Sequence, residues 1–104
     1  MLLCTTWKVR SMQPEAAQRM MTAWGKLEAD MAQVSGMNRL CWYSFSDGSG
    51  GFQVTEVNDD AAVHRFGLES SLALGEFLDM ETRPVLDLES AMPAITAAME
   101  RIAT

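Results

Sequence analysis

The 104-residue chain contains only one histidine, two cysteines and eight basic residues, and each scarcity excludes a class of protein. Two cysteines without a CxxC pair cannot build a disulfide framework, and with a single histidine they cannot complete a metal site. We therefore expect no metal and no other cofactor. The excess of acidic residues gives a net charge of −6, which argues against nucleic acid and anionic membranes as partners.

Long apolar runs are also missing. No stretch approaches the roughly 20 residues of a membrane span, and the first residues lack the basic and apolar segments of a signal peptide. Cys4 and Cys41 are then expected to be free thiols, as is typical of a reducing compartment. These features together predict a cytoplasmic protein with no membrane attachment.

The length predicts a single domain over residues 1–104, with no linker or repeat. A chain of this size buries roughly 60–65% of its unfolded surface, which suffices for one modest core. Hydrophobic residues make up 48% of the chain and charged residues 21%. Both values are typical of a globular protein.

Hydrophobic periodicity divides the chain into strand-like and helix-like segments. Strands are expected at Leu2–Val9, in a hairpin over Arg39–Val57, and at Phe77–Leu86; helices are expected at Pro14–Val34, Asp60–Leu72 and Glu89–Ile102. This order, β-α-β-β-α-β with an extra C-terminal helix, is that of the α+β ferredoxin-like fold. Its strand order separates Cys4 from Cys41 by one strand, a gap of roughly 9–10 Å, which is too wide for a disulfide.

The helices carry specific end signals. Gly36 is expected to cap the first helix, and the run from Asn58 to Asp60 offers N-cap residues for the second. Gly25, inside the first helix, costs about 1 kcal/mol relative to alanine; it either allows close approach or is merely tolerated. Pro93 is expected in the first turn of the last helix, which would then begin near Ser90.

Neither face of the predicted sheet is polar. In the first strand Leu3, Trp7 and Val9 alternate with Leu2 and Cys4, and in the second Leu40 and Trp42 alternate with Cys41, Tyr43 and Phe45. An antiparallel sheet with one wet face would alternate apolar with polar residues. The second face must therefore be covered, in part by the last helix or more fully by the sheet of a twin subunit. We predict a homodimer.

Short motifs in the second half resemble a known superfamily. They are Gly51–Glu56, the helix start Asn58–Asp60, and Phe77–Val85 with its ending Arg83-Pro84-Val85. With the strand pattern, they resemble the dimeric α/β-barrel superfamily, and most nearly an uncharacterised family near the antibiotic-biosynthesis-type monooxygenases. The resemblance implies two sheets packed face to face and a pocket between sheet and helices in each subunit. It implies no activity, because members range from enzymes to proteins without known chemistry.

Three groups of residues are candidates for a site. His64 could act as a general base or a haem or metal ligand, or could be an exposed helix residue. Trp7, Trp42 and Tyr43 could hold a flat organic ligand, or could fill a core or an interface. Glu56 and Arg83 could polarise a substrate carbonyl or enolate, or could form structural ion pairs.

These candidates support competing functions. The first is an uncharacterised homodimer that binds a small organic molecule in a pocket between sheet and helices. The alternative is a cofactor-independent monooxygenase or isomerase that acts on a small aromatic or polyketide-like substrate, with His64 assisting proton removal. A haem-handling protein would need His64 to face the pocket with an open side. The discriminating observation is whether His64 and the aromatic residues converge on one cavity.

Overall fold

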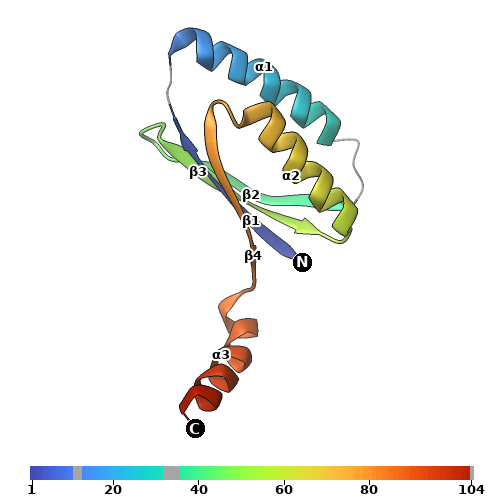
Figure 1. Cartoon of the computed structure of the whole chain (residues 1–104), viewed down its shortest axis with the longest axis vertical. Coiled ribbons are helices and arrows are strands. Elements are labelled where there is room, and N and C mark those ends of the chain that lie inside the picture. Colours follow the sequence, from blue (N-terminus) through green and yellow to red (C-terminus); the bar gives the residue numbers. More distant parts are fainter. Residues whose placement is uncertain (11–12, 32–35, 104) are drawn as a thin grey trace.

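The computed structural model describes residues 1–10, 13–31 and 36–103 (Figure 1). The elements follow in the order β1 (Leu2–Val9), α1 (Pro14–Met31), β2 (Met37–Ser44), β3 (Gly50–Val57), α2 (Asp60–Leu74), β4 (Leu78–Val85) and α3 (Leu88–Ala103). The four strands form one antiparallel sheet in the order β2-β3-β1-β4. This confirms the predicted ferredoxin-like fold with an additional C-terminal helix.

The core lies between one face of the sheet and helices α1 and α2, which both cover that face (Figure 1). Its centre is formed by Leu27 of α1, Leu74 of α2, and Phe77 and Leu78 at the start of β4. Met20 and Trp24 of α1 pack around it, while Val34, the predicted end of this helix, lies outside the described residues. No described atom lies within 4 Å of a side chain added at Gly25, so this glycine is tolerated and serves no close approach.

Strand β2 contains a bulge at Leu40. Arg39 pairs with Thr55 and Cys41 pairs with Val54, so Leu40 is one residue more than β3 can match. Beyond the bulge the side chains alternate as predicted, with Trp42 on the face covered by the helices and Cys41 and Tyr43 on the other face. The extra residue shifts the alternation by one position, so that Arg39, before the bulge, lies on the same covered face as Trp42.

At this bulge, stacked indole rings and an ion pair hold β2 against α1. The indole of Trp42 stacks on that of Trp24, with ring centroids 4.9 Å apart. The guanidinium of Arg39 lies 4.2 Å from the centroid of the Trp42 ring and pairs with Glu28 of α1. It also donates a hydrogen bond of 3.1 Å to Gln53. Arg39 therefore has a structural role.

The second helix begins as predicted, whereas the third does not. Asp59 caps α2 by accepting a hydrogen bond of 3.0 Å from the backbone N–H of Ala61. Asp87 accepts bonds of 2.7 Å from the hydroxyl and 3.0 Å from the backbone N–H of Ser90, which lower the pKa of its carboxyl. This cap starts α3 at Leu88, two residues before the expected position. Pro93 consequently lies in the second turn, where it cannot donate the usual helical hydrogen bond.

The other face of the sheet is open in the single subunit. Its β1 and β3 portion carries the apolar Leu2, Phe52 and Val54 beside the polar Thr6, Lys8 and Glu56. Cys4 and Cys41 lie there as free thiols on either side of Val54. The edge strand β4 places charged residues on this face, Asp79, Glu81 and Arg83. Helix α3 extends away from the sheet and does not cover the open face (Figure 1). The expectation that the last helix covers part of it is therefore wrong for a single subunit.

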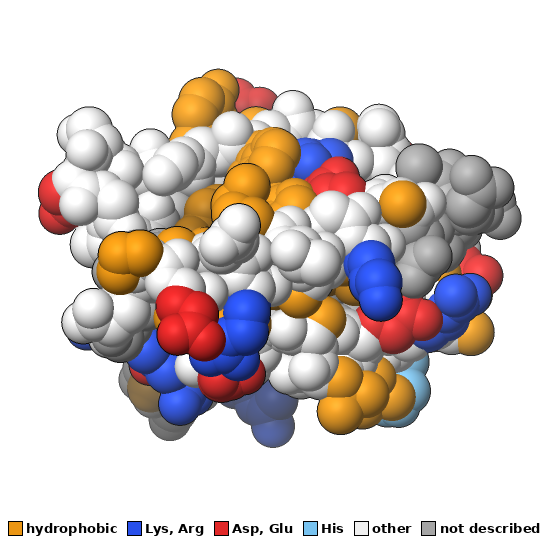
Figure 2. Space-filling view, turned by 90° about the horizontal axis from the view of Figure 1, so that it is seen from above, with side chains coloured by type: hydrophobic (Ala, Val, Ile, Leu, Met, Phe, Trp, Pro, Cys, Tyr) orange, Lys and Arg blue, Asp and Glu red, His pale blue; other side chains and the backbone are white. Residues whose placement is uncertain are grey.

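Charges of both signs lie on one side of the molecule. On the side shown in Figure 2, basic and acidic side chains lie beside one another, with hydrophobic side chains gathered between them. Exposed ion pairs of the described residues include Arg19 with Glu76 at 3.0 Å. Such exposed pairs contribute little to stability, typically about 0–1 kcal/mol.

Candidate functional site

A cavity of about 580 Å³ lies between the covered face of the sheet and helix α2. This volume falls within the range of roughly 300–1,000 Å³ that is usual for small-molecule sites. Strands β1, β3 and β4 form one wall, and Val63, Phe66, Gly67 and Leu68 of α2 contribute to the other. Among the described residues that line it, none has a Lys, Arg, Asp or Glu side chain. The cavity is therefore mostly apolar.

The polar groups of this cavity are hydroxyls. Thr5 of β1 and Thr82 of β4 are paired across the two strands, with their Oγ1 atoms 2.9 Å apart in a hydrogen bond. Thr55 of β3 and Ser70 of α2 are 3% and 7% exposed. Within the part of the chain that the structure describes, their hydroxyl oxygens are buried and have no hydrogen-bond partner. Strand alternation places the three threonines on the covered face.

His64 lies in the second turn of α2 and is among the residues that line this cavity. The residue is exposed, so it lies at the rim. A general base in this position could reach a ligand in the cavity while remaining in contact with water. The described residues that line the cavity include no Lys or Arg side chain to pair with the carboxylates of a haem, so the geometry does not favour the haem-handling function.

The aromatic candidates do not join His64 at this cavity. Trp7 faces the helices, and its indole fills the space where Gly51 has no side chain. Trp42 is stacked on α1, as described above. Tyr43 lies on the open face, with its ring centroid 5.5 Å from that of Phe52. Each of these residues has a packing role in the described structure.

The two charged candidates also lie elsewhere. Glu56 is on the open face of β3, between Leu2 of β1 and Asn38 of β2. Arg83 is on the open face of the edge strand β4 and donates a hydrogen bond of 2.6 Å to Glu81. Neither is among the residues that line the cavity under α2.

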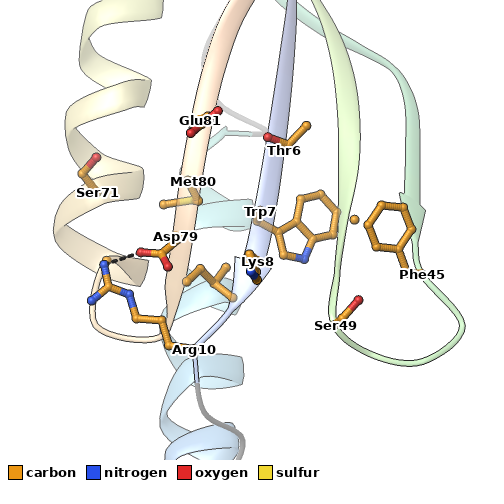
Figure 3. Close-up of a pocket in the computed structure, with 13 residues that line it drawn as sticks. Thr6, Trp7, Lys8, Arg10, Phe45, Ser49, Ser71, Asp79, Met80 and Glu81 are labelled. Carbon is orange, nitrogen blue, oxygen red and sulfur yellow. Dashed lines mark ion pairs between the residues drawn. The ribbon is translucent and has the colours of Figure 1, made fainter.

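A second cavity, of about 790 Å³, lies at the end of the sheet near the β2–β3 turn (Figure 3). Its lining is charged and includes Lys8 and the ion pair between Arg10 and Asp79, whose closest atoms are 2.5 Å apart. The Trp7 ring points toward Phe45 at one side of it (Figure 3). More than half of each side chain of the ion pair is exposed, so water already solvates these charges. The apolar cavity under α2 is therefore the better candidate for an organic ligand.

No group of three or more His, Cys, Asp or Glu side chains within the described ranges is placed to hold a metal ion. In those same ranges, the structure contains no helix with the length and apolar character needed to cross a membrane.

The sheet, its two covering helices and the cavity define a ferredoxin-like α+β protein of the kind found in dimeric α/β barrels. The chain belongs to the family described as "Domain of unknown function (DUF3303)", whose model matches residues 1–99. This confirms the resemblance to an uncharacterised family. No functionally curated protein matches the sequence.

Several solved structures share the fold. SnoaB, a cofactor-independent oxygenase from Streptomyces nogalater, is 15% identical with a TM-score of 0.57, over 83% of this chain and 95% of its own. Rv0793 from Mycobacterium tuberculosis has the same identity and coverage, with a TM-score of 0.58. A dimeric ferredoxin-like protein of unknown function from Jannaschia sp. CCS1 is 14% identical with a TM-score of 0.57, over 82% of this chain and 100% of its own. At these identities the likeness shows the fold alone.

Proposed function

We propose that this protein is a homodimer that binds a small, mostly apolar organic molecule in the cavity between the sheet and α2. The observation that carries the proposal is the lining of that cavity. About 580 Å³ of space is bounded by apolar side chains, with two buried hydroxyls that have no partner among the described residues. Apolar walls with a few placed polar groups are the usual composition of a ligand pocket.

The open face of the sheet supports the dimer. Tyr43, Phe45 and Phe52 form a cluster of rings there, with centroid distances of 5.5 and 6.5 Å between neighbours. Tyr43 is 59% exposed and Phe45 is 51% exposed in the single subunit. A contiguous apolar patch of this kind marks an interface, and the fold is shared with a protein described as dimeric.

Helix α3 supports the same conclusion. Its apolar side chains Met92, Ile95, Met99 and Ile102 recur at helical spacing and are 41–86% exposed. The face of a sheet of four eight-residue strands covers a flat area of roughly 500 Å². A stable interface uses about 800 Å² from each partner. We therefore expect α3, as well as the open face, to take part in the dimer.

Sedimentation equilibrium at micromolar concentration tests the assembly. The expected mass is twice the 11.5 kDa of one chain. A single species with the mass of one chain across the whole concentration range would contradict the dimer and leave the ligand proposal untouched.

Binding is tested with Nile red, a neutral dye that fluoresces in apolar surroundings. Gly67→Leu places a side chain at the cavity wall, where the structure has no atom within 4 Å of the added Cβ among the described residues. We expect this variant to lose about 10-fold or more in dye affinity, because the side chain occupies the space of the ligand. Gly25→Leu on α1 is the matched control, since it is equally unobstructed but lies outside the cavity. Equal dye binding by both variants would rule out this cavity as the site.

The alternative function is a cofactor-independent monooxygenase or isomerase acting on a small aromatic or polyketide-like substrate. The position of His64 at the cavity rim favours it, and SnoaB shares the fold. His64 would take a proton from a carbon next to a carbonyl group. An isomerase would return this proton to another carbon, whereas an oxygenase would let the enolate react with dioxygen. Oxygen uptake by the pure protein with anthrone, a tricyclic aromatic ketone, tests the oxygenase. Uptake no faster than with boiled protein would count against it.

A further inference from the structure

We propose that the cavity under α2 selects neutral molecules with an apolar body and one hydroxyl or carbonyl group, which Thr55 and Ser70 recognise. The same cavity is proposed to exclude carboxylates and phosphates. This inference rests on the proposed binding function and adds to it the chemical class of the ligand.

The exclusion of anions follows from the few charged groups in the cavity lining. None of the described lining residues has a Lys or Arg side chain that could pair with an anion. Met1 lines the cavity, and its ammonium group donates a hydrogen bond of 3.0 Å to the carbonyl of Val57, so this positive charge is held at the end of β1. Among the described lining residues, the one titratable side chain, His64, is at the exposed rim. An anion in the apolar interior, away from these two groups, would therefore remain unpaired, at a cost of several kcal/mol.

The recognition of a hydroxyl or carbonyl group follows from the hydroxyls of Thr55 and Ser70. Buried polar groups in native proteins are almost always hydrogen-bonded, and an exception calls for an explanation. Thr5 and Thr82 satisfy each other across the strands. Thr55 and Ser70 have no such partner within the described residues, and an unmade bond costs about 1–3 kcal/mol. A ligand that completes these bonds recovers that cost on binding.

The placement of the two hydroxyls indicates how the ligand would lie. Thr55 belongs to the sheet wall and Ser70 to the α2 wall of the same cavity. A staggered rotation about the Cα–Cβ bond can redirect either hydroxyl toward the cavity. Each hydroxyl can donate one hydrogen bond and accept another. A single carbonyl oxygen can accept from both, and a ligand hydroxyl can accept from one while donating to the other.

Three naphthalene probes of nearly equal size separate these effects. Naphthalene is apolar, 2-naphthol is neutral with one hydroxyl, and 2-naphthoate is an anion at pH 7. Fluorescence titration of the full chain is expected to give an affinity for 2-naphthol that exceeds that for 2-naphthoate by about 10-fold or more. Thr55→Val and Ser70→Ala should each weaken 2-naphthol by roughly 3- to 10-fold and leave naphthalene unchanged. Thr22→Val on α1 is the control, because it removes a hydroxyl that does not line the cavity.

The outcomes distinguish this inference from the proposed function. If the probes bind but neither variant changes the preference for 2-naphthol, hydroxyl recognition is wrong while ligand binding stands. If 2-naphthoate binds as tightly as 2-naphthol, the exclusion of anions is wrong. If none of the three probes binds, the proposed function fails and this inference fails with it. Circular dichroism of each variant confirms that the fold is retained, so a loss of affinity can be assigned to the hydroxyl.

Discussion

Removing the hydroxyl of Thr55 should make the protein more stable. Thr55 is 3% exposed, and its Oγ1 has no hydrogen-bond partner within the described structure. Valine has nearly the same shape, is at least as well suited to a strand, and carries no oxygen to bury. The desolvation penalty of about 1–3 kcal/mol disappears in Thr55→Val. The free energy of unfolding should therefore rise by at least about 1 kcal/mol, which corresponds to roughly 4 °C in melting temperature.

Thr5→Val provides the matched comparison on the neighbouring strand. Thr5 is also buried, at 8% exposure, but its hydroxyl forms the 2.9 Å bond with Thr82. Valine at this position breaks that bond, so the free energy of unfolding should fall by about 0.5–1.5 kcal/mol. The two identical substitutions are thus expected to act with opposite sign.

Urea unfolding followed by circular dichroism measures both effects. All proteins are compared at one concentration, because association makes apparent stability concentration-dependent. If Thr55→Val destabilises the protein as much as Thr5→Val, the Thr55 hydroxyl has a partner in solution. The Thr55 hydroxyl would then not be available to bind a ligand, and its proposed role in recognition would be refuted.

Further substitutions test the packing, the open face and the rim of the cavity. Gly25→Ala should raise the free energy of unfolding by about 1 kcal/mol, whereas Gly48→Ala should lower it, because Gly48 has a φ of +74°; urea titration measures both. Trp42→Lys should destabilise the subunit itself, since the ring is stacked on α1, whereas Tyr43→Lys should shift the sedimenting species toward the monomer. His64→Ala should leave the melting temperature nearly unchanged, and if oxygenase or isomerase activity is found it should lower turnover by about 10²–10⁴-fold.

A specific result would contradict each of these expectations. A destabilised Gly25→Ala protein would mean that another group approaches α1 at this position. A Tyr43→Lys protein with unchanged mass would place the interface away from the open face. A large drop in melting temperature for His64→Ala would show that the histidine is part of the core.

Local signals in the sequence were sufficient to predict most of the fold. The cap in the run Asn58–Asp60 and the start of the first helix at Pro14 depend on residues within one or two helical turns, and both were found where expected. The start of α3 was missed because two local rules compete. Proline favours the first turn, but the hydrogen bonds between Asp87 and Ser90 begin the helix earlier.

The candidate site depended on information that one sequence does not contain. Whether His64 meets Trp7, Trp42 or Tyr43 is decided by strand register and by a one-residue bulge at Leu40. Neither has a local signature in this chain. The buried hydroxyls were missed for a related reason, because threonine is common on strands and only the three-dimensional structure distinguishes Thr55 from Thr5.

Helix α3 also has a consequence for local stability. Every side chain of this 16-residue helix is at least partly exposed in the single subunit. Because Pro93 in its interior removes one helical hydrogen bond, the helix is only marginally stable in water without packing. Its backbone amides should then exchange with deuterium rapidly in a lone subunit, independently of the slow exchange of the central strands β1 and β3. Packing against a partner would slow the exchange of the α3 amides most. Dilution should therefore speed deuterium uptake first in α3. The rate of deuterium uptake by this helix would then report the fraction of the protein that is assembled.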